Sequence, residues 1–367
     1  MEITFKMITR ILIYMHIFTY MYIHIYVIAL NFLGCSFSDV DLKVTKGKMV
    51  DCRGQNLTEL PIAVRQVNAP IYRLENNPFL QLNRDSLVSL TDLQYISLPT
   101  NQKLLDGIFR GNRELKSIVL SGQTELETSR VFKNLSSVVT LVGLEVESIP
   151  TGLLSPLNSL EQLNITVTGT RLPDDFLRSN KYMRNLSLAG PQLKSLPAGM
   201  FKSMERFQSI YLNTPNASLG CYLASQGLQL LQSFKVVAAL SLDSCIFSKS
   251  APVQADLRHV HIANTGLICG GFSSNYVVTE FTVRHTNIST LAQDCLPPSM
   301  LVLSLDMTHN WIRNISPDAL SHMKFLSVLN LSYNQIRYST YKINSSAFYI
   351  VFIKPLLILP GAVAKIK

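Results

Sequence analysis

The chain has 367 residues, of which 47% are hydrophobic and 16% charged, with a formal net charge of +9 at pH 7. The hydrophobic fraction is enough for a large core. The net charge alone indicates solubility and non-specific attraction, not a particular partner. The sequence contains no HExxH, GxSxG or CxxC motif and no glycine loop that could hold phosphate. It therefore carries none of the common metal or nucleophile motifs, and we expect neither an enzyme nor a cofactor.

Residues 1–36 are predicted to be a signal peptide or a signal anchor. Lys6 and Arg10 precede an apolar run from Ile11 to Leu33, as in a secretory leader. Cleavage after Ser36 or Ser38 would fit the small residues found there. The run is also long enough to cross a bilayer, so an uncleaved anchor is the alternative.

Residues 37–61 are predicted to be a partial N-terminal cap. The stretch from Val50 to Pro61 contains Cys52 and resembles the end of the cysteine-containing cap of extracellular leucine-rich-repeat proteins. A bridge between Cys35 and Cys52 requires cleavage before Cys35 or no cleavage, because both favoured cleavage sites would remove Cys35.

An eleven-residue pattern recurs through residues 62–337. If Leu326 is position one, apolar residues occupy positions one, four, six and eleven, and Asn334 occupies position nine. The same pattern stands 24 residues earlier, starting at Val302. It is the leucine-rich-repeat consensus. Side chains alternate along a strand, so positions four and six point the same way, and a lone unit must stack to bury them. The predicted fold class is an α/β solenoid, a leucine-rich-repeat horseshoe with a parallel concave sheet of about twelve strands.

Position four can be followed through twelve repeats. Position six is apolar in all of them except at Gly143, and the longest step, 30 residues, predicts an insertion in repeat seven on the convex or lateral side. Position nine is Asn only in repeats one, two, eleven and twelve, so the middle coils should turn less regularly. The residues assigned to position four are Tyr72, Ile96, Ile118, Leu141, Leu163, Leu186, Ile210, Leu240, Val260, Phe281, Leu305 and Leu329.

Residues 338–367 are predicted to be an irregular apolar tail. A thirteenth repeat would put Pro355 at position six, where it could not donate a strand hydrogen bond. The tail either covers the open end of the solenoid or belongs to a longer receptor.

Four cysteines recur at roughly one per coil, namely Cys221, Cys245, Cys269 and Cys295. They either serve as small apolar residues of the repeat or form disulfides between neighbouring coils. Cys269 with Cys295 is the favoured pair, because both fall in return segments.

Glycosylation sequons are frequent. Asn-Leu-Ser arises partly from the repeat consensus, but the number of sequons and the leader together favour an extracellular protein. Two of them occupy position five, where a glycan would obstruct the concave sheet. The sequons are at Asn56, Asn134, Asn164, Asn185, Asn216, Asn287, Asn314, Asn330 and Asn344.

The concave face consists of positions three, five and seven, which are mostly small and neutral. It has no basic stripe, so binding of nucleic acid or another polyanion is not favoured. The residues chosen as its candidate binding face are Tyr211, His259, His261, Glu280, Arg284 and Asp306.

Three histidines lie on or beside this face. His259 and His261 occupy positions three and five of repeat nine, and His285 occupies position eight of repeat ten. They are either unrelated surface imidazoles or a group that titrates in an acidifying compartment.

The leader, cap and repeats together resemble the ectodomain of Toll-like receptors and their extracellular relatives over about residues 50–340, most closely from Ile315 to Asn334. A C-terminal cysteine cap, a second membrane span and a signalling domain are not recognised. The resemblance implies a secreted or cell-surface chain that binds a protein or microbial ligand in innate immunity. An extracellular adhesion or matrix protein is the alternative, and a dimer or a membrane tether through the N-terminal segment also stays open.

Overall fold

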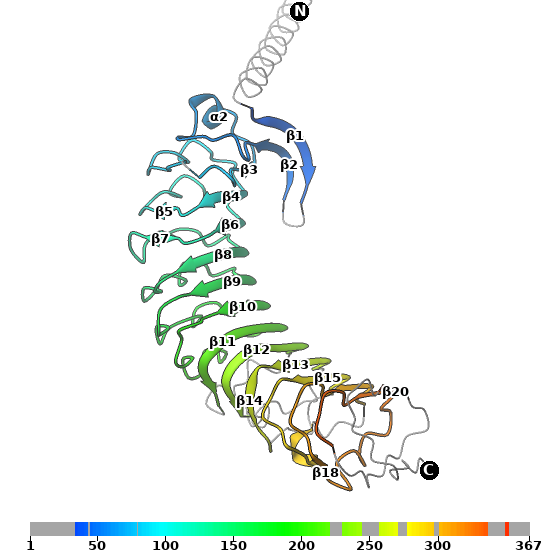
Figure 1. Ribbon diagram of the computed structural model, residues 1–367. Coiled ribbons are helices and arrows are strands. Elements are labelled where there is room, and N and C mark those ends of the chain that lie inside the picture. Colours follow the sequence, from blue (N-terminus) through cyan, green and yellow to red (C-terminus); the bar gives the residue numbers. More distant parts are fainter. Residues whose placement is uncertain are drawn as a thin grey trace, which may run out of the picture. The chain divides into compact units, whose positions relative to one another are not determined.

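The protein is described by a computed structural model that places residues 34–42, 45–78, 80–220, 230–243, 257–270, 277–296, 301–336 and 349–351. The chain divides into two compact units, Met1–Leu144 and Glu145–Lys367. Each unit is built from short parallel strands joined by return segments (Figure 1). Apart from its last three residues, the predicted leader lies outside the described residues, as does the sequon at Asn344.

The first unit opens with an antiparallel hairpin of β1 (Ser36–Asp41) and β2 (Lys46–Asp51). The short helix α2 (Ile62–Gln66) follows, and the buried Tyr72 donates a 2.9 Å hydrogen bond from its hydroxyl to the carbonyl of Val64. Two short strands, β5 (Lys103–Leu104) and β7 (Glu125–Leu126), pair within the return segments. The parallel sheet after β2 contains β3 (Ile71–Arg73), β4 (Tyr95–Thr100), β6 (Ser117–Ser121) and β8 (Thr140–Val146), in which the unit ends.

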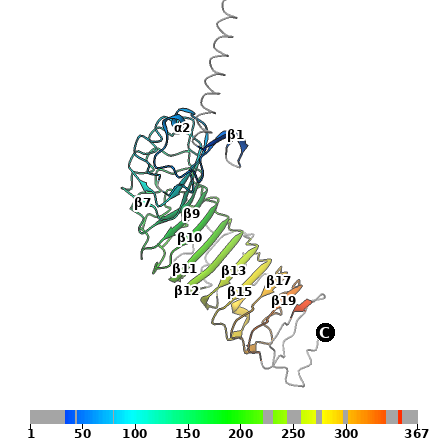
Figure 2. The same cartoon turned by 45° about the horizontal axis from the view of Figure 1, so that its top comes forward.

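The second unit continues the same construction, and its strands from β9 to β15 run side by side in Figures 1 and 2. Its parallel sheet contains β9 (Gln162–Val167), β10 (Asn185–Ala189), β11 (Ser209–Leu219), β12 (Ser233–Asp243), β13 (His259–Ala263), β15 (Glu280–Arg284), β17 (Ser304–Asp306), β19 (Val328–Asn330) and β20 (Tyr349–Val351). Outside this row are β14 (Thr265–Ile268), which pairs with β12, the return strands β16 (Thr290–Leu291) and β18 (Asn314–Ile315), and the 3-10 helix η4 (Gln293–Cys295).

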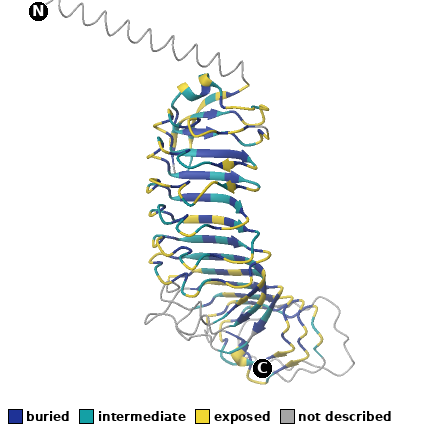
Figure 3. Ribbon diagram, turned by 90° about the vertical axis from the view of Figure 1, so that its left-hand side faces the viewer, coloured by how far each residue is buried: buried dark blue, intermediate teal, exposed yellow. Residues whose placement is uncertain are grey.

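The described return segments are turns and short strands, with little helix. The repeats and their parallel strands are therefore confirmed, and the fold is a β-rich form of the predicted solenoid. Along the strands, buried residues alternate with more exposed ones (Figure 3). Positions one and four are buried in every described repeat, and each large aliphatic side chain buried there contributes about 1.5–3 kcal/mol of transfer free energy.

The position assigned to repeat eight was wrong. Ile210 pairs with Phe234, and Phe234 pairs with Val260, so Phe234 and not Leu240 occupies position four. Phe234 is 1% exposed, whereas Leu240 is 61% exposed. The step from Ile210 to position four of repeat eight shortens from 30 to 24 residues, and the step from there to Val260 lengthens from 20 to 26. The predicted insertion in repeat seven therefore disappears. The apolar run of β12 contains two candidate pairs at the same spacing, and only the pairing with its neighbours selects the buried one.

Gly143 does not leave position six empty. Leu141 and Val142 pair with Ile118 and Val119, after which the strand turns inward one residue later and buries Leu144. Gly143 has φ +76°, and a Cβ on it would overlap the carbonyl oxygen of Leu120. A glycine is required here because the extra residue brings two backbones too close for a side chain.

Asparagine at position nine links neighbouring coils. Asn310 Nδ2 donates to the carbonyls of Met307 on its own coil (2.8 Å) and Val283 on the preceding coil (2.9 Å), and its Oδ1 accepts the N–H of Thr286 at 2.7 Å. Asn77 and Asn334 bond in the same way. These bonds satisfy carbonyls that the turn would otherwise bury without a partner.

The sequence spacing assigned this role in repeat two to Asn101, but the structure does not place it there. Asn101 is exposed at φ 56°, and the next residue, the buried Gln102, donates its side-chain amide to the carbonyl of Leu80 at 2.9 Å. The shift follows a register irregularity between Ser97 and Thr100.

Two disulfides join described cysteines. Cys35 bonds to Cys52 and closes the open end of the β1–β2 hairpin, while Cys269 bonds to Cys295, the pair favoured from the sequence. Cleavage after Ser36 or Ser38 would remove Cys35 and shorten β1. We therefore propose that any leader cleavage occurs before Cys35. Cys221 and Cys245 lie outside the described residues.

The tail predicted to be irregular contains one short strand among its described residues. The backbone of β20 pairs in parallel with β19, and Ile350 stands opposite Leu329. A thirteenth strand therefore forms 21 residues after the twelfth, a shorter step than the one that would have placed Pro355 at position six. In the described part of the chain, no helix has the length and hydrophobicity needed to cross a membrane.

Candidate functional site

The candidate face of the second unit is formed by rows of side chains at equal positions on neighbouring strands. Position five gives one row because the strands pair in register. The row runs through Tyr211, Lys235, His261, Thr282 and Asp306, on β11, β12, β13, β15 and β17. We call the outward side chains at positions three, five and seven of these five strands the central face.

Lys235 belongs to this face although the sequence analysis missed it. Its Nζ lies 5.4 Å from the ring centroid of Tyr211, a cation–π distance. The error in the register of repeat eight hid this residue, because it placed Ser241 and Asp243 on the face instead. Only the pairing of Phe234 with Ile210 and Val260 reveals Lys235.

His259 and His261 differ in their surroundings. Nδ1 of His259 lies 2.9 Å from a carboxylate oxygen of Glu280, and both side chains are more than half exposed. His261 is half-buried between strands. Burial, with the nearby charges of Lys235 and Arg284, lowers the pKa of His261 below that of a free histidine, although Asp306 opposes the shift. The neutral imidazole is therefore favoured at position five.

Arg284 and Asp306 form an ion pair between β15 and β17. The N–H of Thr308 also donates to Asp306 at 3.1 Å. Burial acts to raise the pKa of Asp306, but the hydrogen bonds from Arg284 and Thr308 outweigh it, and the pKa is lowered. The charges of Arg284 and Asp306 are thus already matched, and the central face remains without a basic stripe.

A stack of rings lies at the edge of this face. His285 lies over His309 with 4.7 Å between ring centroids, and His309 lies over Tyr333 with 4.2 Å. All three have φ between 51° and 58°, in the left-handed region. The sequence analysis identified His285 alone. The signal for the others was their shared position eight in consecutive repeats, one residue before the turn residue at position nine.

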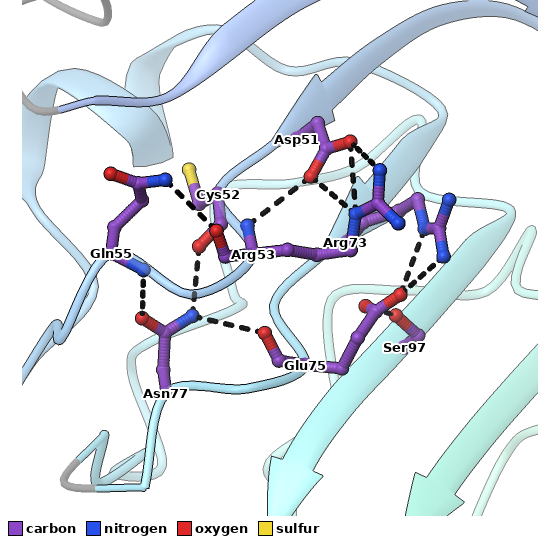
Figure 4. A network of polar contacts seen from close by, with 8 residues as sticks. All are labelled: Asp51, Cys52, Arg53, Gln55, Arg73, Glu75, Asn77 and Ser97. Carbon is purple, nitrogen blue, oxygen red and sulfur yellow. Dashed lines mark hydrogen bonds and ion pairs between the residues drawn. The ribbon is translucent and has the colours of Figure 1, made fainter.

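The first unit carries a separate polar network on its outward face (Figure 4). Arg53 donates to both carboxylate oxygens of Asp51, at 2.8 and 2.6 Å, and Arg73 donates to Glu75 at 2.9 Å. Ser97 also bonds to Glu75. The hydrogen bond from Arg53, against the opposing effect of burial, lowers the pKa of Asp51. The two ion pairs lie within single coils, and the bond from Ser97 to Glu75 joins adjoining coils, so the charges of the network are already paired.

The sequons fall into two groups. Asn185 at position three, and Asn164 and Asn330 at position five, lie on the outward face of the second unit, on β9, β10 and β19. Asn56, Asn134, Asn216, Asn287 and Asn314 are exposed elsewhere. None of the described sequons occupies an outward position of the central face. In the part of the chain that the structure describes, no cluster of three or more His, Cys, Asp or Glu side chains could hold a metal ion.

Comparisons with known proteins agree with this architecture. Residues 277–336 match the family model described as leucine rich repeat. Human podocan-like protein 1 is 23% identical over 314 residues, which cover 83% of this chain and 54% of that protein, and mouse podocan is 24% identical over 170 residues, which cover 44% of this chain and 28% of that protein. The chain thus spans about half of the first of these relatives.

Two solved structures share the fold. An internalin from Listeria monocytogenes superposes with a TM-score of 0.54 at 13% identity, covering 84% of this chain and 87% of the internalin. A chain from the Drosophila Toll–Spatzle complex superposes with a TM-score of 0.52 at 16% identity, covering 78% of this chain and 44% of the other.

Proposed function

We propose that this chain, a leucine-rich-repeat protein, is an extracellular binding module that holds a protein partner on the central face. The observation that carries the proposal is the placement of the sequons. Glycans on Asn164 and Asn185 would cover β9 and β10, and one on Asn330 would cover β19. On the strands between them, β11 to β17, positions three, five and seven carry aromatic, charged and hydroxyl side chains and no sequon, and Asn216 lies further along β11. Aromatic residues and Arg are enriched where proteins bind one another.

The names of the relatives support a binding role. Toll is seen in complex with Spatzle, and that complex is described as a hub in Drosophila development and innate immunity. The Toll likeness favours recognition of a protein or microbial ligand by a receptor-like ectodomain. The likeness to the podocan relatives leaves adhesion or matrix interaction as the second candidate. Both candidates place the chain outside the cell, as a binding protein rather than an enzyme.

A new glycan on the central face tests the proposal. Lys235→Asn with Val237→Thr creates a sequon on β12, where both side chains point outward. Gln192→Asn with Lys194→Thr creates a matched sequon at two exposed positions of a return segment in the same unit. The proteins, made in animal cells, are screened against displayed secreted and cell-surface proteins. We expect partners to be lost with the first variant and kept with the second. Partners retained by both would show that the central face is not the site.

A further inference from the structure

The only tryptophan of the chain, Trp311, is exposed on a return segment. It is 58% exposed, while Ile312 beside it is fully buried and Arg313 is exposed again. Side chains alternate here as along a strand, so the indole points out of the coil. A large aromatic ring left in water costs free energy, and Trp is a residue type that is enriched at interfaces.

The neighbour of Trp311 on the preceding coil is the sequon residue Asn287. The N–H of Trp311 donates to the carbonyl of Ile288 at 3.1 Å, and the N–H of Arg313 donates to that of Ser289 at 2.8 Å. Ile288 is buried and Asn287 is exposed, as Ile312 and Trp311 are. Paired chains run about 4.8 Å apart. Asn287 and Trp311 thus occupy the same repeat position on adjacent segments, and both are exposed there.

The amide of Asn287 is hydrogen-bonded through its oxygen to the coil before it. Its Oδ1 accepts the N–H of Leu267 at 2.8 Å. This bond fixes the amide plane through its oxygen and leaves Nδ2, the atom that carries an N-linked sugar, for modification. In glycosylation, Nδ2 forms a bond to C1 of the first sugar, the bond from C1 to the phosphate oxygen of a polyprenyl diphosphate donor breaks, and Nδ2 loses one proton.

We propose that Asn287 is glycosylated and that its first N-acetylglucosamine packs against the indole of Trp311. The C–H bonds on one face of a sugar ring are weakly positive and suit the negative face of an aromatic ring. The sugar covers apolar surface that would otherwise face water, and the indole holds the glycan against the return segments, away from the central face. The inference rests on the proposed extracellular role, since the sugar is added in the secretory pathway.

Because the chain has a single tryptophan, tryptophan fluorescence reports on the surroundings of Trp311 alone. Protein from animal cells is compared in three forms: with intact glycans, trimmed to one N-acetylglucosamine per site, and with the sequon removed. Two variants remove it. Asn287→Gln changes the amide itself, and Ser289→Ala keeps the amide and its bond to Leu267. Asn134→Gln, which removes an exposed sequon in the first unit, is the control.

Peptide mass spectrometry should find Asn287 modified. The intact and trimmed forms and the Asn134→Gln variant should share a shorter emission wavelength and slow quenching by acrylamide. Both sequon variants should shift emission to longer wavelength and be quenched faster. Identical emission in all forms, or an unmodified Asn287 beside other modified sequons, would overturn the inference and leave the proposed function standing. A chain with no modified sequon would overturn the extracellular role as well.

Discussion

Single residues at the turn decide how neighbouring coils are joined. Asn310, Asn77 and Asn334 each connect the carbonyls at position six of two consecutive coils. Gln102 does part of this work in repeat two with a longer side chain that starts one residue later. In these four repeats the linking group is a side-chain amide, and the local register determines which residue supplies it.

Replacing Asn310 with Ala should destabilise the protein. The change leaves buried carbonyls at Met307 and Val283 and the N–H of Thr286 without these bonds, and each unsatisfied group costs about 1–3 kcal/mol. We expect the free energy of unfolding, measured with denaturant, to fall by about 3 kcal/mol or more. Asn158→Ala, at an exposed position, should stay within about 0.5 kcal/mol of the parent. Equal losses in both variants would contradict the role of Asn310.

Substitutions at Gly143 and Gly152 distinguish two costs of adding a side chain, the backbone strain at positive φ and the overlap with a neighbouring backbone. Both have nearly the same positive φ, +76° and +77°, but a Cβ at Gly143 would overlap the Leu120 carbonyl, whereas one at Gly152 would meet its nearest atom, Oγ of Ser155, at 4.0 Å. Gly152→Ala should cost about 1–2 kcal/mol, from backbone strain alone. Gly143→Ala should cost clearly more, because β8 must also move. Similar thermal shifts for the two variants would argue against the close approach.

At the scale of the element, β12 shows how neighbouring strands decide which side chains of a strand are buried and which point outward. Its sequence offers Phe234 with Val236, or Leu240 with Leu242, as residues at positions four and six. The neighbouring strands select the first pair, and this selection also brings Lys235 to the central face.

Two substitutions in β12 test that register. Phe234→Ala should lower the free energy of unfolding by about 3–5 kcal/mol, as expected when a buried aromatic ring is removed. Leu240→Ala should change it by no more than about 0.5 kcal/mol, because the side chain is mostly in water. Denaturant titrations of the two proteins check this. The reverse order of losses would restore the register assigned from sequence.

His261 on β13 should make the free energy of unfolding depend on pH. The pKa of His261 is lowered in the folded chain by burial and by Lys235 and Arg284. The unfolded chain therefore binds more protons as pH falls through about 6.5, the pKa of a free histidine. The contribution of the neutral His261 to the free energy of unfolding is therefore fully present above that pH. It is lost as the pH falls toward the lower pKa that His261 has in the folded chain.

The measurement is the free energy of unfolding between pH 7.5 and 5, for the parent and for His261→Gln. We expect the parent to lose more stability on acidification than the variant. His259→Gln, which removes the more exposed imidazole beside Glu280, is the comparison within the same strand. An unchanged pH slope in His261→Gln would contradict the effect of burial.

At the scale of the whole molecule, each unit repeats one solution to the same problem. A coil cannot cover its own apolar residues, so each coil covers the next. The ends need other devices, and at the N-terminal end the hairpin of β1 and β2 and the disulfide Cys35–Cys52 supply one. The sides of the coils then remain for glycans and for a partner.

If the chain is secreted and glycosylated, its mass should differ from that of its sequence. Expressed in animal cells, the chain should be heavier than its sequence mass, and an enzyme that removes N-linked glycans should abolish the excess. Bacterial protein is the control. A mass that the enzyme does not alter would contradict the extracellular role.

The repeat pattern by itself determined the fold, because positions one, four and six recur at a spacing that only stacked strands can bury. It also favoured the Cys269–Cys295 pair and the outward position of His259, Glu280, Arg284 and Asp306. The register of β12, the extra residue at Gly143 and the strand β20 were decided by the tertiary structure. Alternation along a strand has a period of two, so a sequence with several apolar pairs fits more than one register until its neighbours pair with it. The stack of His285 on His309 and Tyr333, and the placement of Asn287 and Trp311 on adjacent segments, have the same cause. Residues 24 apart become neighbours only when two coils lie in register.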